Sequence, residues 1–571
     1  MRYKVLRVII SILFFVIGCN LVYIQIIRGQ DYFNLSVNNR IRVIPLKELR
    51  GRVLDRNGVV LAQNRLSFNV TVIPQDIKDK DALFAFLSDV LDTDRDILNK
   101  RFVRKHATPF APVILAEDVD KRMAMILEEN KFRFPGLYIE ETFRREYPFR
   151  STGAHVLGNV GKITKAKIEE VEEYGYTPQS IVGYSGIEDY YDTFLRGRPG
   201  GVQIEVNNRG QQVRLLSLKD PQKGEDVRLT IDQRIQEVAA NALGTKRGAI
   251  IVMNLDSGEI LGLVSSPPFD PNTFTSVKLQ NNVSELYTDE AAPLLNRAIQ
   301  GLYPPGSVFK IVLTLAGLDS GKIKPETTFN CPGYFKLGRR RFHCLHVHGQ
   351  QNLYEGIIHS CNVYFYNVGD IIGPDIIHKY ARMFGLGKPT KIDLPFERRG
   401  QIPSRIQRKI ASNRGWFRGD TLNLSIGQGD ILVTPLQVLG LMATIARSGK
   451  VVQPHLIKSV GAKDIVKFAT IKHVRVSKKS YDVLQAALRS VVADPHGTAR
   501  ILNIPGFEVS GKTGTAQTAP GKNSHAWFVG YDMSTQPKIA FCVFLEYGGS
   551  SYYACRMARD MLKRLRAQQI L

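Results

Sequence analysis

A serine and a lysine lie three residues apart in GLYPPGSVFK, residues 301–310. Gly306 and the two prolines before it would stop any earlier helix, so a new helix should begin here. At this spacing Ser307 and Lys310 share one helix face and can touch, with the serine in the positive field of the helix N-terminus. A buried Lys310 would favour its neutral form and could take the serine proton. The pair is a candidate nucleophile and base, although a lone Ser-x-x-Lys is usually an ordinary helix start.

Two further motifs follow. HSCNVYFYNVG (359–369) places Ser360 and Asn362 before an aromatic run that should be buried; an ordinary helix cap is the simpler explanation. VSGKTGTAQT (509–518) alternates in the manner of a strand. A glycine in that strand would let a ligand backbone approach closely. The candidate site residues of this strand are Lys512, Thr513, Gly514 and Thr515.

The same stretch matches a nucleotide-binding pattern. GFEVSGKT (506–513) fits the phosphate-loop sequence G-x-x-x-x-G-K-T. A phosphate loop must open a helix whose N-terminus holds the anion. The continuation GTAQTAPG, with Gly514 and Pro520, is a poor helix. The sequence therefore argues against a nucleotide site.

The N-terminus has the pattern of a membrane anchor. Residues 8–27 contain no charge and follow Arg2, Lys4 and Arg7. Twenty apolar residues suffice to cross a bilayer, and the segment lacks the small-x-small site of a cleavable signal peptide. The positive-inside tendency places the N-terminus in the cytoplasm and residues 28–571 outside. An external chain with net charge +24 and pI about 9.7 fits anionic lipid or an acidic wall polymer and excludes nucleic acid.

The composition changes along the chain, which is long enough for several domains. Residues 31–225 are mixed and charged, and the polar, turn-rich segment 217–227 is a plausible boundary. Strands at both ends of the following part, with a helix-rich middle, predict an α+β domain whose sheet closes late. The predicted elements are two strands around the turn 55–58, helices in 81–92, 121–131 and 229–243, a hairpin in 247–267, strands at 525–532 and 538–548, and a helix over 552–571.

Ser-x-x-Lys, Ser-x-Asn and Lys-Thr-Gly in this order form the signature of penicillin-binding proteins and serine β-lactamases. The flanking stretches 50–58, 154–161, 183–197 and 424–437 resemble the class B penicillin-binding proteins. The resemblance implies a cytoplasmic tail and transmembrane anchor (1–30), an elongated pedestal or dimerisation-like domain (31–225) and a transpeptidase domain (226–571). That last domain would have the penicillin-binding, serine β-lactamase-like fold, an antiparallel sheet flanked by helices.

Cysteines and histidines cluster between the first two motifs. Three thiols and an imidazole within 31 residues match a structural Cys3His zinc site. A Cys331–Cys344 disulfide and chance clustering are the alternatives, and His343, His346 and His359 compete for the imidazole position. The arrangement resembles one found in the elongation-specific members of the class and absent from septal ones. The predicted ligands of one structural Zn²⁺ are Cys331, Cys344, His348 and Cys361.

The resemblance also implies a mechanism. Ser307 would attack the penultimate D-alanine carbonyl of a stem peptide, with Lys310 as base and the N–H groups of Ser307 and Thr515 as oxyanion hole. Ser360 would relay a proton to the leaving amine, assisted by Lys512, while Asn362 orients the donor peptide. Thr513 and Thr515 with Lys512 would hold the terminal carboxylate, and the donor would add as a strand beside the Lys-Thr-Gly strand.

The implied setting is the inner membrane, with the catalytic domain in the periplasm. Expected partners are peptidoglycan stem peptides and lipid-linked precursors, β-lactams, a multi-span peptidoglycan glycosyltransferase and scaffold proteins of the elongation complex. Three alternatives stay open: a septal transpeptidase, a membrane-bound β-lactam sensor and a β-lactamase. A sensor normally needs several spans and a signalling domain. A β-lactamase is usually shorter and needs a water-activating residue that the sequence does not reveal.

Overall fold

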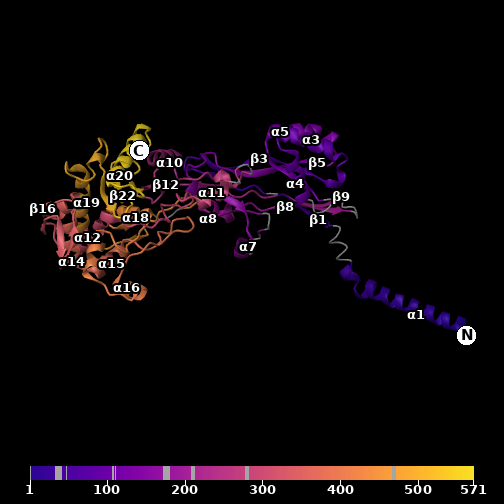
Figure 1. The fold of residues 1–571 in the computed structure, drawn as a ribbon, viewed down its shortest axis with the longest axis horizontal. Helices are drawn as coiled ribbons and strands as arrows, with labels where there is room; N and C mark the ends of the chain where they lie inside the picture. Colours follow the sequence, from indigo (N-terminus) through magenta and orange to yellow (C-terminus); the bar gives the residue numbers. More distant parts are fainter. Residues whose placement is uncertain are drawn as a thin grey trace. The chain divides into compact units, whose positions relative to one another are not determined.

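The computed structural model describes residues 2–32, 41–46, 48–105, 109, 111–171, 176, 180–206, 212–276, 279, 282–465 and 471–571. The chain forms two compact units, and Figure 1 labels their elements. The first unit contains residues 1–51, 64–144 and 196–225, and the second contains 52–63, 145–195 and 226–571. Segments 52–63 and 145–195 therefore pack with the C-terminal part of the chain. The linear division at residue 225 stays a prediction.

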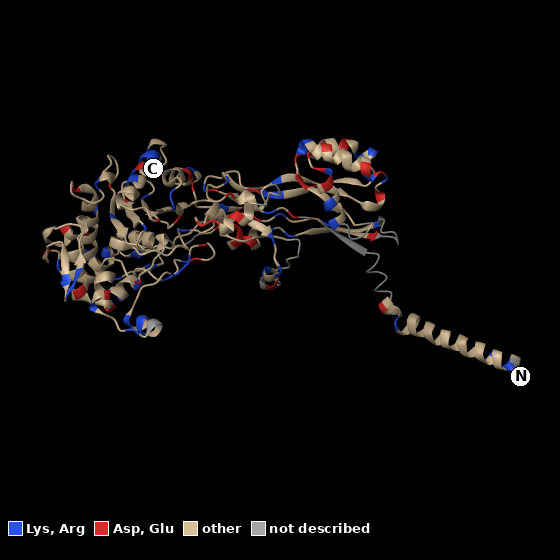
Figure 2. Cartoon of the chain, viewed as in Figure 1, with Lys and Arg blue, Asp and Glu red and all other residues tan. Residues whose placement is uncertain are grey.

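The N-terminal segment is one long apolar helix. Helix α1 (Arg2–Val22) continues into a π-helical turn (Tyr23–Ile27). Tyr3–Ile27 has a mean hydropathy of 2.5, and no other helix in the described part of the chain is both long and apolar enough to cross a membrane. Figure 2 shows the helix tan between its basic ends. This helix fits a single-pass anchor.

Two groups of strands lie mainly in the first unit. Strands β3 (Val60–Val72), β4 (Val113–Val119) and β5 (Leu137–Glu146) pack with helices α3 (Lys80–Leu91), α4 (Arg95–Lys105) and α5 (Lys121–Asn130). Both helices predicted from apolar spacing, α3 and α5, are confirmed, and Asp79 and Asp120 cap them by accepting backbone N–H groups. A separate antiparallel sheet has the order β1 (Ile41–Leu46), β8 (Gly200–Val206), β9 (Gln212–Lys219).

A five-stranded antiparallel sheet forms the centre of the second unit. Its order is β12 (Ile260–Ser266), β11 (Gly248–Asn254), β23 (Ile539–Leu545), β22 (His525–Asp532), β21 (Ser510–Ala516). Every residue of β22 and β23 is buried, which requires cover on both faces. Helices α10 (Gln233–Leu243) and α20 (Ser551–Ala567) pack on each other and on the sheet, and α18 (Pro435–Ala446) packs on β11, β22 and β23. The predicted α+β class, the late-closing sheet and these elements are confirmed.

The helical part lies between β12 and β21 in the sequence. A 3-10 turn (Gly306–Phe309) leads into α12 (Lys310–Asp319), which packs against α14 (Asn362–Ile372), α15 (Pro374–Met383) and α19 (Lys478–Ala493). Helix α13 (Leu353–Ile358) precedes α14, and α16 (Arg405–Ser412) and α17 (Arg418–Ser425) follow α15. Two small hairpins separate α12 from α13. They pair β13 (Phe329–Cys331) with β16 (Gly349–Gln351), and β14 (Tyr334–Leu337) with β15 (Arg340–His343).

The predicted hairpin near residue 55 is also present. Strand β2 (Val53–Leu54) pairs antiparallel with the start of β3 and parallel with β10 (Val227–Leu229). The carboxylate of Asp55 accepts the backbone N–H groups of Asn57 at 2.7 Å and Val59 at 2.8 Å, which fixes the turn. Strand β3 runs much further than the sequence indicated, because its second half belongs to the first unit.

Candidate active site

Ser307 lies in the 3-10 turn just before α12, so the predicted helix start is confirmed with one tighter turn at its beginning. The turn is fixed from one side by the loop 427–433. Gly306 donates its N–H to the carbonyl of Gly427 at 3.0 Å, and Tyr303 and Val433 exchange two backbone hydrogen bonds of 2.9 Å. The Ser307 side chain is half-buried. The serine is therefore held on a rigid backbone and remains accessible.

Strand β21 fixes the same turn from another side. A Cβ on Gly306 would lie 2.8 Å from the Thr515 carbonyl oxygen, and a Cβ on Gly514 would lie 3.0 Å from the Pro305 carbonyl oxygen. The indole N–H of Trp527 donates to the Pro304 carbonyl at 3.1 Å. The Ser307 turn thus occupies the space beside Gly514. Gly514 therefore makes room for this turn, and its role in admitting a ligand backbone stays a prediction.

Lys310 is completely buried at the first position of α12. Its Nζ donates to the Ser360 carbonyl at 2.7 Å, to Asn362 Oδ1 at 2.8 Å and to Ser360 Oγ at 3.3 Å. Among the described residues it makes no hydrogen bond to Ser307, so the transfer of the serine proton to Lys310 stays a prediction. Burial lowers the pKa of Lys310 to about 8, which favours the neutral amine that a base requires.

Ser360 lies in the turn between α13 and α14, with 7% of its surface exposed. Its φ of 53° is in the left-handed region, where a non-glycine residue stores strain. Its Oγ accepts hydrogen bonds from Lys310 and, at 3.0 Å, from Lys512. The predicted second motif therefore joins the other two through one hydroxyl group.

Lys512 is also completely buried, on strand β21. Its Nζ donates to the Thr513 carbonyl at 3.1 Å. Burial lowers its pKa well below the usual value, and repulsion from Lys310 lowers it further. Thr513 Oγ1 donates to Thr498 Oγ1 at 2.9 Å. Thr498 was missed by sequence reasoning, because only the tertiary fold brings the loop after α19 to this strand.

Strand β21 is the last strand of its sheet, so in the described part of the chain one of its edges has no strand partner. Thr515 is exposed on it, while Thr513 is buried. Asn362 lies at the beginning of α14, half-buried, and its Nδ2 donates to the His343 carbonyl at 3.3 Å. The three motifs thus bring the predicted catalytic residues to one place beside an open strand edge.

The predicted metal ligands form one cluster. The ligand atoms of Cys331, Cys344, His348 and Cys361 all lie within 4.8 Å of one another. His348 Nδ1 lies 3.6 Å from Cys331 Sγ and 3.5 Å from Cys344 Sγ, and the sulfurs of Cys344 and Cys361 are 3.9 Å apart. All three cysteines are free, so the alternative disulfide is not present. His359 lies outside the cluster and stacks on His348, with 5.7 Å between the two ring centres.

These separations fit the tetrahedral coordination of one metal ion. Metal–sulfur bonds of about 2.3 Å and a metal–nitrogen bond of about 2.0 Å give tetrahedral edges of about 3.8 Å and 3.5 Å. The pKa of Cys344 is lowered to about 3, chiefly by the hydrogen bond between the Cys344 and Cys361 sulfurs, so one thiolate is already favoured. The backbone N–H of Asn362 also donates to Cys344 Sγ at 3.2 Å. The donor set suits a soft or borderline divalent cation.

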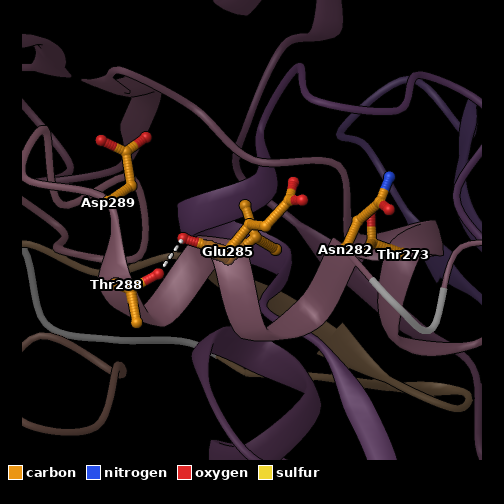
Figure 3. Close-up of a pocket in the computed structure, with 6 residues that line it drawn as sticks. Thr273, Asn282, Glu285, Thr288 and Asp289 are labelled. Carbon is orange, nitrogen blue, oxygen red and sulfur yellow. Dashed lines mark hydrogen bonds between the residues drawn. The ribbon is translucent and has the colours of Figure 1, made fainter.

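A separate open cavity of about 470 Å³ lies beside α11 (Val283–Thr288) (Figure 3). The Thr288 hydroxyl donates to the Glu285 backbone carbonyl at 3.3 Å in the last turn of this helix. The lining holds carboxylates, amides and hydroxyls but no lysine or cysteine, and none of the predicted site residues. Its members are Thr273, Asn282, Glu285, Leu286, Thr288 and Asp289. It does not compete with the Ser307 site as a catalytic centre.

A nucleophilic serine served by buried lysines, beside the open edge of a helix-covered sheet, is the geometry of the penicillin-recognising serine transpeptidases. Comparison with known families agrees. The penicillin binding protein transpeptidase domain matches residues 248–565, and the penicillin-binding protein dimerisation domain matches residues 45–229. The chain belongs to the class B penicillin-binding proteins and resembles penicillin-binding protein 2.

Individual relatives support this assignment over nearly the whole chain. The peptidoglycan D,D-transpeptidase MrdA of Acinetobacter baumannii is 33% identical over 97% of this chain and 85% of its own length. The Escherichia coli MrdA is 30% identical over 96% of this chain and 91% of its own. Penicillin-binding protein 2 of Helicobacter pylori, solved in complex with MreC, has a TM-score of 0.82 at 30% identity and covers 93% of this chain and 100% of its own. The chain is a transpeptidase enzyme.

Proposed function

We propose that this chain is a peptidoglycan D,D-transpeptidase that cross-links stem peptides through an acyl-enzyme on Ser307 during cell elongation and rod-shape maintenance. The observation that carries the proposal is the convergence of two buried lysines, from α12 and β21, on Ser360 Oγ beside the Ser307 turn. The MrdA relatives support the elongation role over the septal alternative.

In the acylation step Ser307 Oγ attacks the penultimate D-alanine carbonyl and forms a C–O bond. The serine proton passes to neutral Lys310, whose position beside Ser360 connects it to Lys512. The N–H groups of Ser307 and Thr515 stabilise the oxyanion. The C–N bond then breaks, and the Ser360 hydroxyl relays a proton to the departing D-alanine amine. A neighbouring stem-peptide amine finally attacks the ester carbonyl and forms the C–N bond of the cross-link. The ester C–O bond breaks, and the amine proton returns to Ser307 Oγ.

The donor peptide adds to the open edge of β21 as an extra strand. Its terminal carboxylate is bound by Lys512, Thr513 and Thr515, and Asn362 orients its backbone. Thr498 positions Thr513 through their hydroxyl–hydroxyl bond of 2.9 Å. Gly514 keeps the Ser307 turn close enough to β21 for both to contact one substrate.

The Cys3His cluster would hold a single structural Zn²⁺ through Cys331, Cys344, His348 and Cys361. Bound there, the ion would supply coordination bonds that cross-link two hairpins to the Ser360–Asn362 turn, with all four positions filled by protein. Because Cys361 lies between Ser360 and Asn362, these bonds would hold the second motif in place.

The relatives support the proposed partners, and the basic residues before the anchor support the proposed orientation. The Helicobacter pylori protein was solved with MreC, and another similar structure belongs to a peptidoglycan synthase complex that coordinates polymerization and crosslinking. By analogy this chain works with elongation-complex scaffold proteins and a multi-span peptidoglycan glycosyltransferase on lipid-linked precursors. Its anchor lies in the inner membrane with the N-terminus cytoplasmic and the catalytic domain periplasmic.

The test is intact-mass measurement of the full chain in detergent after exposure to benzylpenicillin. The wild-type chain and the control Ser320→Ala, an exposed serine after α12, should each gain one stable penicillin mass. Ser307→Ala should gain none while keeping its melting temperature. An adduct on Ser307→Ala would place the nucleophile elsewhere. Rapid loss of the antibiotic without a stable adduct would indicate a β-lactamase.

A further inference from the structure

The hairpin β14–β15 carries four neighbouring cations: Lys336, Arg339, Arg340 and Arg341. Cross-strand pairing fixes which side chains share a face. Phe335 pairs with Phe342, and both rings pack on Tyr366, so this face is the inner one. Side chains alternate along a strand. Lys336 and Arg341, which pair with each other, therefore lie on the outer face together with Tyr334 and His343.

The four cations share the lack of an acidic partner in the described part of the chain. Within the described residues none of the four forms a salt bridge, whereas Arg408 and Arg418 each pair with a carboxylate. The guanidinium of Arg341 instead lies 4.7 Å from the Tyr334 ring centre, and that of Arg340 lies 4.9 Å from Phe342. A cation–π contact orients a guanidinium and leaves its N–H groups able to bind an anion.

The hairpin contacts the active site at His343. The His343 carbonyl accepts the hydrogen bond from Asn362, the residue expected to orient the donor. Arg341 lies two residues earlier on β15, a rise of about 7 Å. An extended peptide advances about 3.3 Å per residue, so two or three donor residues cover the same distance. On the proposed function, a donor that runs beside β15 would therefore bring the residues that precede its terminal D-alanines level with Arg341.

We propose that the outer face of this hairpin binds free carboxylates of the donor stem peptide, on the residues preceding D-Ala-D-Ala, with Arg341 and Lys336 as specificity residues. This inference rests on the proposed function. The hairpin base is held in place where the Cys344 N–H donates to the Gly333 carbonyl at 2.8 Å. β-Lactams, which mimic only the terminal D-alanines, do not reach this face.

The adjacent arginines provide a matched test in the full-length chain. The probe is a synthetic pentapeptide ending in D-Ala-D-Ala, with its upstream carboxylates free or amidated. The readout is the peptide concentration that halves the rate of Ser307 acylation by a fluorescent penicillin. For the wild type we expect the free-acid peptide to halve the acylation rate at a concentration about three- to tenfold lower than the amidated peptide does. This difference is what one or two exposed, charged hydrogen bonds contribute.

Arg341→Gln should reduce that preference to less than about twofold, whereas Arg340→Gln, which removes the same charge from the other face, should keep it. Without peptide, both variants should be acylated by penicillin at the wild-type rate, which shows that they fold. Two outcomes overturn this inference but leave the proposed function standing. One is an equal loss of the free-acid preference in both variants. The other is a wild-type chain that shows no such preference, or with which the peptide does not compete at all. A wild type that penicillin does not acylate overturns the proposed function, and the inference falls with it.

Discussion

A methyl group added at Gly514 tests how the Ser307 turn is positioned. Its carbon would lie 2.9 Å from Val308 Cγ2, 3.0 Å from the Pro305 carbonyl oxygen and 3.1 Å from Trp527 Cβ. Ordinary contacts between carbon atoms are about 3.5–4.0 Å. Val308 and Trp527 are completely buried and Pro305 contributes a backbone atom, so no flexible side chain can simply turn away. The turn must therefore move away from β21.

The cost follows from that displacement. Overpacking in a dense interior destabilises by about 1–3 kcal/mol, which lowers the melting temperature of a domain of this size by roughly 1–5 °C. A displacement of the nucleophile approaching 1 Å costs on the order of a hundredfold in rate. We expect Gly514→Ala to lose both stability and most of its acylation by penicillin, because one displacement causes both losses.

The assay compares Gly514→Ala with Gly440→Ala in the full chain. Gly440 lies within α18, and a Cβ added there would meet no atom within 4 Å, so alanine should be neutral or stabilising. Melting temperature and the rate of Ser307 acylation are measured for both. Acylation of Gly514→Ala at the wild-type rate would refute the reasoning. A slowed rate with unchanged stability would favour the interpretation in which Gly514 makes room for a ligand.

Three further predictions concern ionisation and metal. Because the pKa of Lys310 is lowered to about 8, the rate of Ser307 acylation should rise with pH and level off above about pH 8. A rate that stays constant from pH 6 to 9 would contradict Lys310 as the base. The same lowering means that the folded chain binds fewer protons than the unfolded chain between about pH 8 and 10.5, so stability should rise across that window in thermal melts. The purified chain should carry about one zinc ion by mass spectrometry. Cys331→Ser should lose the ion, and its melting temperature should fall by about 5 °C or more, whereas Cys542→Ser, at another buried cysteine, should keep the ion. Metal retained by Cys331→Ser would exclude Cys331 as a ligand.

The order of three short motifs was enough to predict one site from segments two hundred residues apart. Lys512 and Lys310 both reach Ser360, which no single motif could have indicated. Strands and helices with a clear apolar period, such as β22 and α10, were also predictable. These features depend on local pattern or on a recurring combination of residues, and both are visible in a linear sequence.

Other features depend on packing and were not predictable. The (i, i+3) spacing suggested a bond between Ser307 and Lys310, but the 3-10 turn and the Asn362 side chain direct Lys310 elsewhere. Thr498 carries no motif, and it meets Thr513 only because α19 packs on β21. The placement of residues 145–195 in the second unit follows from tertiary contacts rather than composition, which changes only near residue 225.

The two lysines also determine how the site can be charged. Each Nζ lies within 3.3 Å of Ser360 Oγ, so the nitrogens are separated by about 6 Å at most, where two positive charges repel by about 3 kcal/mol at an effective dielectric near 20. Both pKa values are lowered, and one proton shared through Ser360 costs less than two. On the proposed function, the donor carboxylate binds beside Lys512 and favours its charged form, so the proton should reside there. Substrate binding thus leaves Lys310 neutral. The base therefore becomes available when the peptide to be cleaved is bound.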